Sequence, residues 1–156
     1  TPPYLCEAAC VAINVLENDA EVRRRVAALR TNTHRLRECC RDAATPFYRL
    51  FDVSGNNADS PLMFASLRPG VLPGADSVED QLRVLEAVED GCFRNDMGVC
   101  VARFAEADDS APKRPSLRFA ASAAHNPESY PLILATIARL AEEAIQQLQS
   151  KQQQQQ

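Results

Sequence analysis

The spacing of apolar residues switches between helical and strand periods along this chain, and that switching restricts the fold more than any other feature. The expected elements are helices over about 4–16 and 20–40, strands over 47–53 and 62–67, a helix over about 76–93, strands over 97–104 and 117–123, and a helix over about 126–148. Paired short strands followed by helices predict an α+β fold, a mostly antiparallel sheet covered by helices.

Short polar signals set the expected helix starts. Asp19 can cap the second helix, Asp76 with Glu79 has the spacing of a capping pair, and Asn126 before a proline suits the last helix. The final glutamine run is of low complexity, and we expect it to fray. We therefore predict one domain over 1–148 and a glutamine-rich tail over 149–156.

Charge and composition exclude several classes of protein. The 156 residues hold 17 Lys and Arg against 21 Asp and Glu, a net charge of −4, which argues against binding nucleic acid through phosphates. Five glycines form no phosphate-binding loop, and no apolar run is long enough to cross a membrane, so we expect this segment to be soluble. One face of the second helix carries arginines that we expect to be solvated or paired with a partner's acids, rather than to bind RNA or anionic lipid. They are Arg23, Arg24, Arg25, Arg30, Arg35 and Arg37.

The cysteines do not have the spacing of a zinc site. Zinc sites commonly use close ligand pairs such as C-x-x-C, a spacing that this chain lacks. The six residues are Cys6, Cys10, Cys39, Cys40, Cys92 and Cys100. Most fall in apolar periodic segments, so we expect free or buried thiols in a reducing compartment and no metal ligands.

Motifs for catalysis are lacking, and one arginine is the candidate binding residue. In the strand over 117–123, alternation puts Leu117 and Phe119 on the core face and Arg118 on the other face, beside the small Ala120. A guanidinium between small side chains has room for a two-pronged hydrogen bond to a carboxylate, although a surface or interface ion pair is the alternative. His125 precedes a helix start, so we expect it to pack or cap rather than to act as an acid or base.

Three segments resemble the α-oxoamine synthases, pyridoxal-phosphate enzymes that condense an amino acid with an acyl-CoA. The stretch SLRFAASAAHNPES over 116–129, followed by a long amphipathic helix, is similar to the end of that family. The opening Pro2-Pro3 helix and Asp59-Ser60-Pro61 also resemble family motifs. The resemblance implies that residues 1–148 form the small C-terminal domain of a fold-type I pyridoxal-phosphate enzyme.

Within this family, the serine palmitoyltransferases are the most similar group. The stretches 101–104 (VARF) and 115–118 (PSLR) resemble the non-catalytic first subunit, whereas SAAHN is nearer to catalytic members. The resemblance implies condensation of L-serine with palmitoyl-CoA to 3-ketodihydrosphingosine, the first step of sphingolipid synthesis. It also implies a heterodimer with a second subunit, at the cytosolic face of the endoplasmic reticulum membrane, with membrane attachment through segments outside this chain. A catalytic relative that uses another amino acid is the alternative.

The same resemblance assigns roles by position. The family's aldimine lysine lies upstream of the Pro-Pro opening, and neither Lys113 nor Lys151 matches it. Pyridoxal 5'-phosphate would then be held by upstream residues or by the partner, so we expect no catalytic or cofactor-binding residue here and no activity from this fragment alone. Arg118 matches the arginine that binds the amino-acid carboxylate in catalytic members, whereas in the non-catalytic subunit the same residue would be structural or bind no ligand. A non-enzymatic interaction module is a third possibility, and it predicts an exposed apolar patch on the last helix.

Overall fold

The computed structural model describes residues 3–54, 59–72, 77–102 and 114–154, and it confirms the predicted α+β fold. Its elements are α1 (Pro3–Asn18), α2 (Ala20–Arg41), α3 (Pro46–Leu50), β1 (Phe51–Ser54), β2 (Leu62–Leu67), α4 (Val78–Arg94), β3 (Cys100–Ala102), β4 (Ser116–Ala120), the 3-10 turn η1 (Pro127–Ser129) and α5 (Tyr130–Gln153). The strands form a four-stranded sheet in the order β1-β2-β4-β3, in which every neighbouring pair is antiparallel. Strand β4 is therefore an interior strand.

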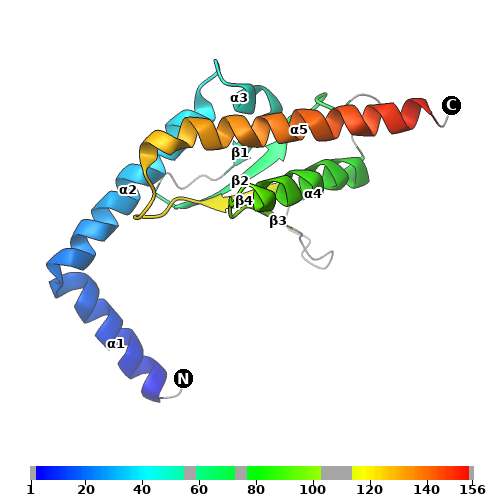
Figure 1. The fold of residues 1–156 in the computed structure, drawn as a ribbon. Coiled ribbons are helices and arrows are strands. Elements are labelled where there is room, and N and C mark those ends of the chain that lie inside the picture. Colours follow the sequence, from blue (N-terminus) through cyan, green and yellow to red (C-terminus); the bar gives the residue numbers. More distant parts are fainter. Residues whose placement is uncertain (1–2, 55–58, 73–76, 103–113, 155–156) are drawn as a thin grey trace.

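The core lies between one face of the sheet and the helices α3, α4 and α5 (Figure 1). Met63, Ala65 and Leu117 from the sheet are fully buried, and α5 contributes Leu134 and Ile137. The other residues of β2 and β4 alternate with these and are mostly half-buried or exposed, which is the pattern of a sheet with one covered face. The last helix thus buries its apolar stripe, and the exposed patch that an interaction module requires is not found on it. Leu132 is the exposed large apolar side chain of α5 within the described residues.

Two of the three predicted helix starts are confirmed. The side chain of Asp19 accepts hydrogen bonds from the backbone N–H groups of α2, and Asn126 caps η1 through the N–H of Glu128. The start of α4 is corrected, because Ser77 caps that helix by accepting from the N–H of Asp80. Asp76 lies outside the described residues.

The first predicted strand was placed too early. Thr45 accepts a hydrogen bond from the N–H of Tyr48 and Pro46 occupies the first turn, so the segment starts as the helix α3 and becomes a strand only at Phe51. Phe47 and Phe51 are four residues apart and stack with ring centroids 4.9 Å apart. A helical turn brings them together, which the strand period would not do.

Two other strands are shorter than predicted. The chain leaves α4 through Asp96, which has a φ of 56°, so Met97–Val99 do not pair and β3 begins at Cys100. Residues 103–113, which include the end of the predicted strand over 97–104, lie outside the described residues. Strand β4 ends at Ala120, and α5 remains helical to Gln153, beyond the predicted end near residue 148 and into the predicted tail.

Helix α1 and the first half of α2 extend away from the body formed by the sheet and the other helices (Figure 1). Val11, Ile13 and Leu16 of α1 are exposed, and Val26 in the first half of α2 is exposed too. Only the second half of α2 reaches the body, where Leu36 and Cys40 are buried.

The arginine face of α2 is also divided. Arg24 and Arg25 are exposed and pair with Glu21, and Arg35 pairs with Glu38, as a solvated face predicts. The prediction of a solvated side chain is wrong for Arg37, which is 3% exposed. Its guanidinium donates to the carbonyl of Ser60 over 3.0 Å. Its position near the body end of α2 places it over the segment that leads into β2.

Candidate functional site

Arg118 lies at the centre of the uncovered face of the sheet. Its neighbours Leu117 and Phe119 are buried on the helix side, and Arg118 and Ala120 are exposed on the opposite side, as alternation predicted. The strand register places Phe64 of β2 and Cys100 of β3 directly beside it. The arginine therefore projects from an interior strand, from the face that no described helix covers.

One neighbour fixes the direction of the guanidinium. The Nε–H of Arg118 donates to Cys100 Sγ over 3.3 Å, and the Cys100 thiol donates to the Arg118 carbonyl over 3.8 Å. Within the described part of the chain, the two terminal nitrogens of Arg118 have no hydrogen-bond partner and no carboxylate pairs with it. Since these two nitrogens are the pair that binds a carboxylate in parallel, the geometry leaves the required donors available. Arg118 is not among the residues that line four cavities formed by described residues.

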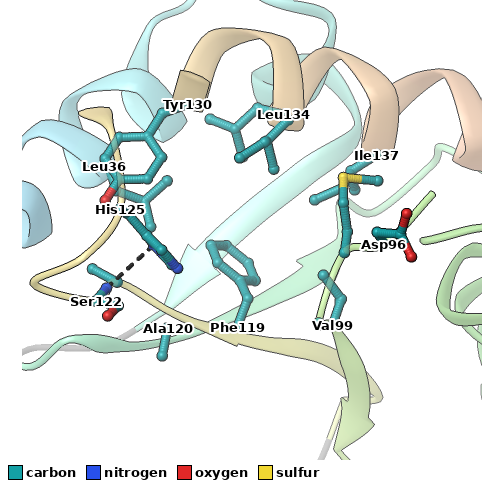
Figure 2. Close-up of a pocket in the computed structure, with 14 residues that line it drawn as sticks. Leu36, Asp96, Val99, Phe119, Ala120, Ser122, His125, Tyr130, Leu134 and Ile137 are labelled. Carbon is teal, nitrogen blue, oxygen red and sulfur yellow. Dashed lines mark hydrogen bonds between the residues drawn. The ribbon is translucent and has the colours of Figure 1, made fainter. Parts of the chain in front are cut away.

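A cavity of about 350 Å³ lies on the other side of the sheet, beneath α5. Figure 2 shows Leu134 and Ile137 of α5 above it, Phe119 and Val99 below, and Tyr130 with His125 at one end. This cavity was not predicted from the sequence, because the residues of the cavity wall have the periodic spacing of ordinary core residues. Its position depends on the unpaired segment 97–99, which was predicted as strand.

The loop at the His125 end of the cavity is fixed by hydrogen bonds. Asn32 of α2 is buried, and its amide donates to the carbonyls of Ser122 and His125 over 2.8 and 2.9 Å. The N–H of Ser122 donates to Nδ1 of His125 over 3.2 Å, which leaves Nε2 to act as the donor of the ring. The ring lies edge-on to Tyr130 at 6.1 Å. His125 therefore has the packing role that the sequence predicted.

Tyr130 is the one residue of the cavity wall whose polar atom is buried without a partner. The residue is 2% exposed, and its hydroxyl has no hydrogen-bond partner among the described residues. Burial raises the pKa of this phenol above its ordinary value, and the nearby Cys39 raises it further.

The residues present do not fit covalently bound pyridoxal phosphate. Lys151 is exposed near the C-terminal end of α5, whereas Arg118 is on strand β4. Lys113 lies outside the described residues. None of four cavities formed by described residues is lined by a lysine, so none of these four offers an amine for an aldimine.

The six cysteines are all free thiols, and two of them, Cys39 and Cys100, are half-buried. Cys6 and Cys10 are exposed on α1, whereas Cys40 and Cys92 are buried in the core. Burial raises the pKa of Cys40 to about 12 and that of Cys92 to about 11. Across the described residues, no three His, Cys, Asp or Glu side chains gather where they could hold a metal ion.

Comparison with known proteins finds likenesses among solved structures alone. No family model matches the chain, and no curated protein sequence matches it. Among solved structures, the chain is similar to serine palmitoyltransferase from Sphingomonas wittichii, with 20% sequence identity and a TM-score of 0.49. The similarity covers 76% of this chain and 24% of that protein, so the chain spans about a quarter of its length. In the described ranges, no helix combines the length and apolarity needed to cross a membrane.

Proposed function

We propose that this chain is the C-terminal domain of a serine palmitoyltransferase subunit, working with a second subunit that supplies the aldimine lysine. The observation that carries the proposal is Arg118, held on an interior strand with both terminal nitrogens available. Together with the SLRFAASAAHNPES motif, its place matches the arginine that binds the amino-acid carboxylate in this family. Holding the carboxylate of serine orients the bonds at its α-carbon for the cofactor, which is a positioning contribution.

Two exposed surfaces of this domain support the proposal that another domain or subunit packs against it. None of the described helices covers the face of the sheet that carries Arg118, where Phe64 is half-buried and Leu62 is exposed. Helix α1 has one charged residue, Glu7, between Pro3 and Leu16, and its described side chains are exposed. A helix that is apolar on all sides is stable in water only when something covers it. A large domain or second subunit would cover both surfaces.

The cofactor is assigned to the rest of the enzyme under this proposal. Pyridoxal 5'-phosphate would be bound by upstream residues or by the partner, in a heterodimer at the cytosolic face of the endoplasmic reticulum membrane. Serine and palmitoyl-CoA are substrates of the complex, and this domain contributes the carboxylate contact. The first-subunit assignment rests on the resemblance of the VARF and PSLR stretches, whereas SAAHN is nearer to catalytic members, so a catalytic enzyme that uses another amino acid is the alternative.

The test is condensing activity measured with and without the partner. The full-length protein that contains residues 1–156 is purified with any co-purifying family member, and 3-ketodihydrosphingosine is measured from serine and palmitoyl-CoA. We expect product from the complex and none from the full-length protein alone or from residues 1–156. Product from the isolated chain would overturn the proposal. Activity of the full-length protein by itself with another amino acid would favour the catalytic alternative.

A further inference from the structure

The pairing of Arg118 with Cys100 carries an inference about how the guanidinium is held for a ligand, and its functional part rests on the proposed function. Cys100 of β3 stands directly opposite Arg118 of β4 in the register, so the two side chains lie on the same face of the sheet. The Cβ atoms of such directly opposed residues are about 4.5–5.5 Å apart. A short cysteine side chain therefore reaches the middle of the arginine side chain, at Nε, and not its two terminal nitrogens.

The Cys100 thiol makes two hydrogen bonds to the same arginine. Its sulfur accepts from the Nε–H of Arg118 over 3.3 Å, and its S–H donates to the Arg118 carbonyl over 3.8 Å. A thiol has one proton and a sulfur that accepts, so the two bonds do not compete. The cysteine thereby links the guanidinium of Arg118 to the backbone of the same residue.

Of the two residues that the register places directly beside Arg118, only Cys100 has a hydrogen-bonding side chain. The other is Phe64 of β2, whose ring carries neither an N–H nor an oxygen. Ala120, two residues further along β4 on the same face, has only a methyl group and is exposed. Cys100 can therefore orient the guanidinium, while the small Ala120 leaves room beside it for a carboxylate.

Holding Nε also decides how a carboxylate can approach Arg118. A guanidinium binds a carboxylate in parallel through two neighbouring N–H groups, either those of both terminal nitrogens or those of Nε and one terminal nitrogen. Because Cys100 occupies the Nε–H, the pair that is left is the two terminal nitrogens. An arginine that is already held also loses less rotamer freedom when it binds, so it binds more tightly.

We propose that Cys100 is a positioning residue, which holds Nε of Arg118 so that the two terminal nitrogens point end-on toward the carboxylate of the amino-acid substrate. Cys100 acts through Arg118 and does not itself touch substrate. Serine can replace it in this role, because a hydroxyl also accepts from Nε and donates to a carbonyl. Valine has a similar size and suits a strand, but it can form neither hydrogen bond. Cys100→Ser and Cys100→Val are therefore a matched pair of variants.

The first test measures the order of the Arg118 side chain in residues 1–156 and needs no substrate. Nitrogen-15 relaxation of the Nε–H gives an order parameter, and the signal is assigned by its absence in Arg118→Lys. We expect a value near that of rigid backbone, about 0.85, in the unaltered chain and in Cys100→Ser, and a value below about 0.6 in Cys100→Val. An unchanged value in Cys100→Val, or an equal fall in the two variants, would overturn the inference.

Cys39→Val is the control for this measurement. Cys39 is a half-buried free thiol, as Cys100 is, but it lies on α2. Its replacement should leave the order parameter of the Arg118 Nε–H unchanged. A fall as large as that in Cys100→Val would mean a general loss of packing and would contradict the specific role of the Cys100 hydrogen bond.

The second test is the steady-state kinetics of the co-purified complex. Losing the fixed orientation should raise the KM for serine about three- to tenfold in Cys100→Val. The kcat should change little, since the carboxylate contact is made before the reaction and kept during it. Cys100→Ser should restore the KM. A lower kcat in both variants with the KM unchanged is what a purely structural role predicts, and it would overturn the positioning role.

The two tests separate this inference from the proposed function. If Arg118→Ala and Cys100→Val both leave the KM unchanged while the Arg118 Nε–H loses order in Cys100→Val, the orientation by Cys100 is supported and the substrate role of Arg118 is wrong. If Arg118→Ala raises the KM and Cys100→Val does not, the substrate role of Arg118 is supported and the positioning role of Cys100 is overturned.

Discussion

The buried arginine of α2 gives the sharpest prediction about stability. Arg37→Met keeps most of the aliphatic stem but removes the guanidinium that donates to Ser60. The Ser60 carbonyl loses a charged hydrogen bond, and such bonds contribute about 1.5–3 kcal/mol. For a chain of this length, each kcal/mol shifts the melting temperature by roughly 2–4 °C, so we expect a fall of about 3–12 °C.

Arg35→Met is the matched control two residues away on the same helix. Arg35 is exposed and pairs with Glu38 over 3.3 Å, and exposed pairs of this kind contribute about 0–1 kcal/mol. Both variants are unfolded by heat and by urea, followed by circular dichroism. If Arg37→Met and Arg35→Met lower the free energy of unfolding equally, the buried role given to Arg37 is wrong.

Two further predictions concern the core. Gly91→Val should destabilise the chain by about 1–3 kcal/mol in urea unfolding, because a Cβ at Gly91 would lie 2.7 Å from a methyl carbon of Leu140. Gly98→Val is the control and should change the free energy of unfolding little, because nothing lies within 4 Å of a Cβ at that position. Equal losses of stability in the two variants would contradict this packing. In thiol labelling at pH 8, the exposed Cys10 should react quickly, whereas the buried Cys40 should react only on unfolding. The free energy of unfolding should be greatest below about pH 9 and fall toward pH 12, because the Cys40 thiol resists ionisation in the folded chain and ionises readily in the unfolded chain. Similar labelling rates, or a Cys40→Ala variant with the same alkaline loss of stability, would refute it.

The elements that the sequence located well are those whose signals are local. The strand over 62–67 was predicted with the bounds that the structure has, and the caps at Asp19 and Asn126 are confirmed, since each depends on a few neighbouring residues. Alternation around Arg118 also predicted correctly that Leu117 and Phe119 are buried and that Arg118 and Ala120 are exposed, although Ser116 at the start of β4 is buried too.

The errors occurred where distant contacts decide the outcome. Helical spacing predicted α1 itself, but spacing does not determine burial, because burial depends on what the helix contacts, and α1 extends beyond the body. Arg37 has the same local pattern as the exposed Arg35, and only its place above Ser60 buries it. The cavity beneath α5 could not be predicted either, because no pattern distinguishes residues that fill a core from residues that surround a hollow.

The central claim is that Arg118 presents its guanidinium to the carboxylate of an amino-acid substrate. The most direct measurement is the KM for serine of the co-purified complex carrying Arg118→Ala, compared with a complex carrying Arg139→Ala on the helix side of the domain. Losing a paired, charged contact predicts a rise in KM of about ten- to a hundredfold for Arg118→Ala and almost no change for Arg139→Ala. Equal KM values in the two complexes would contradict the account.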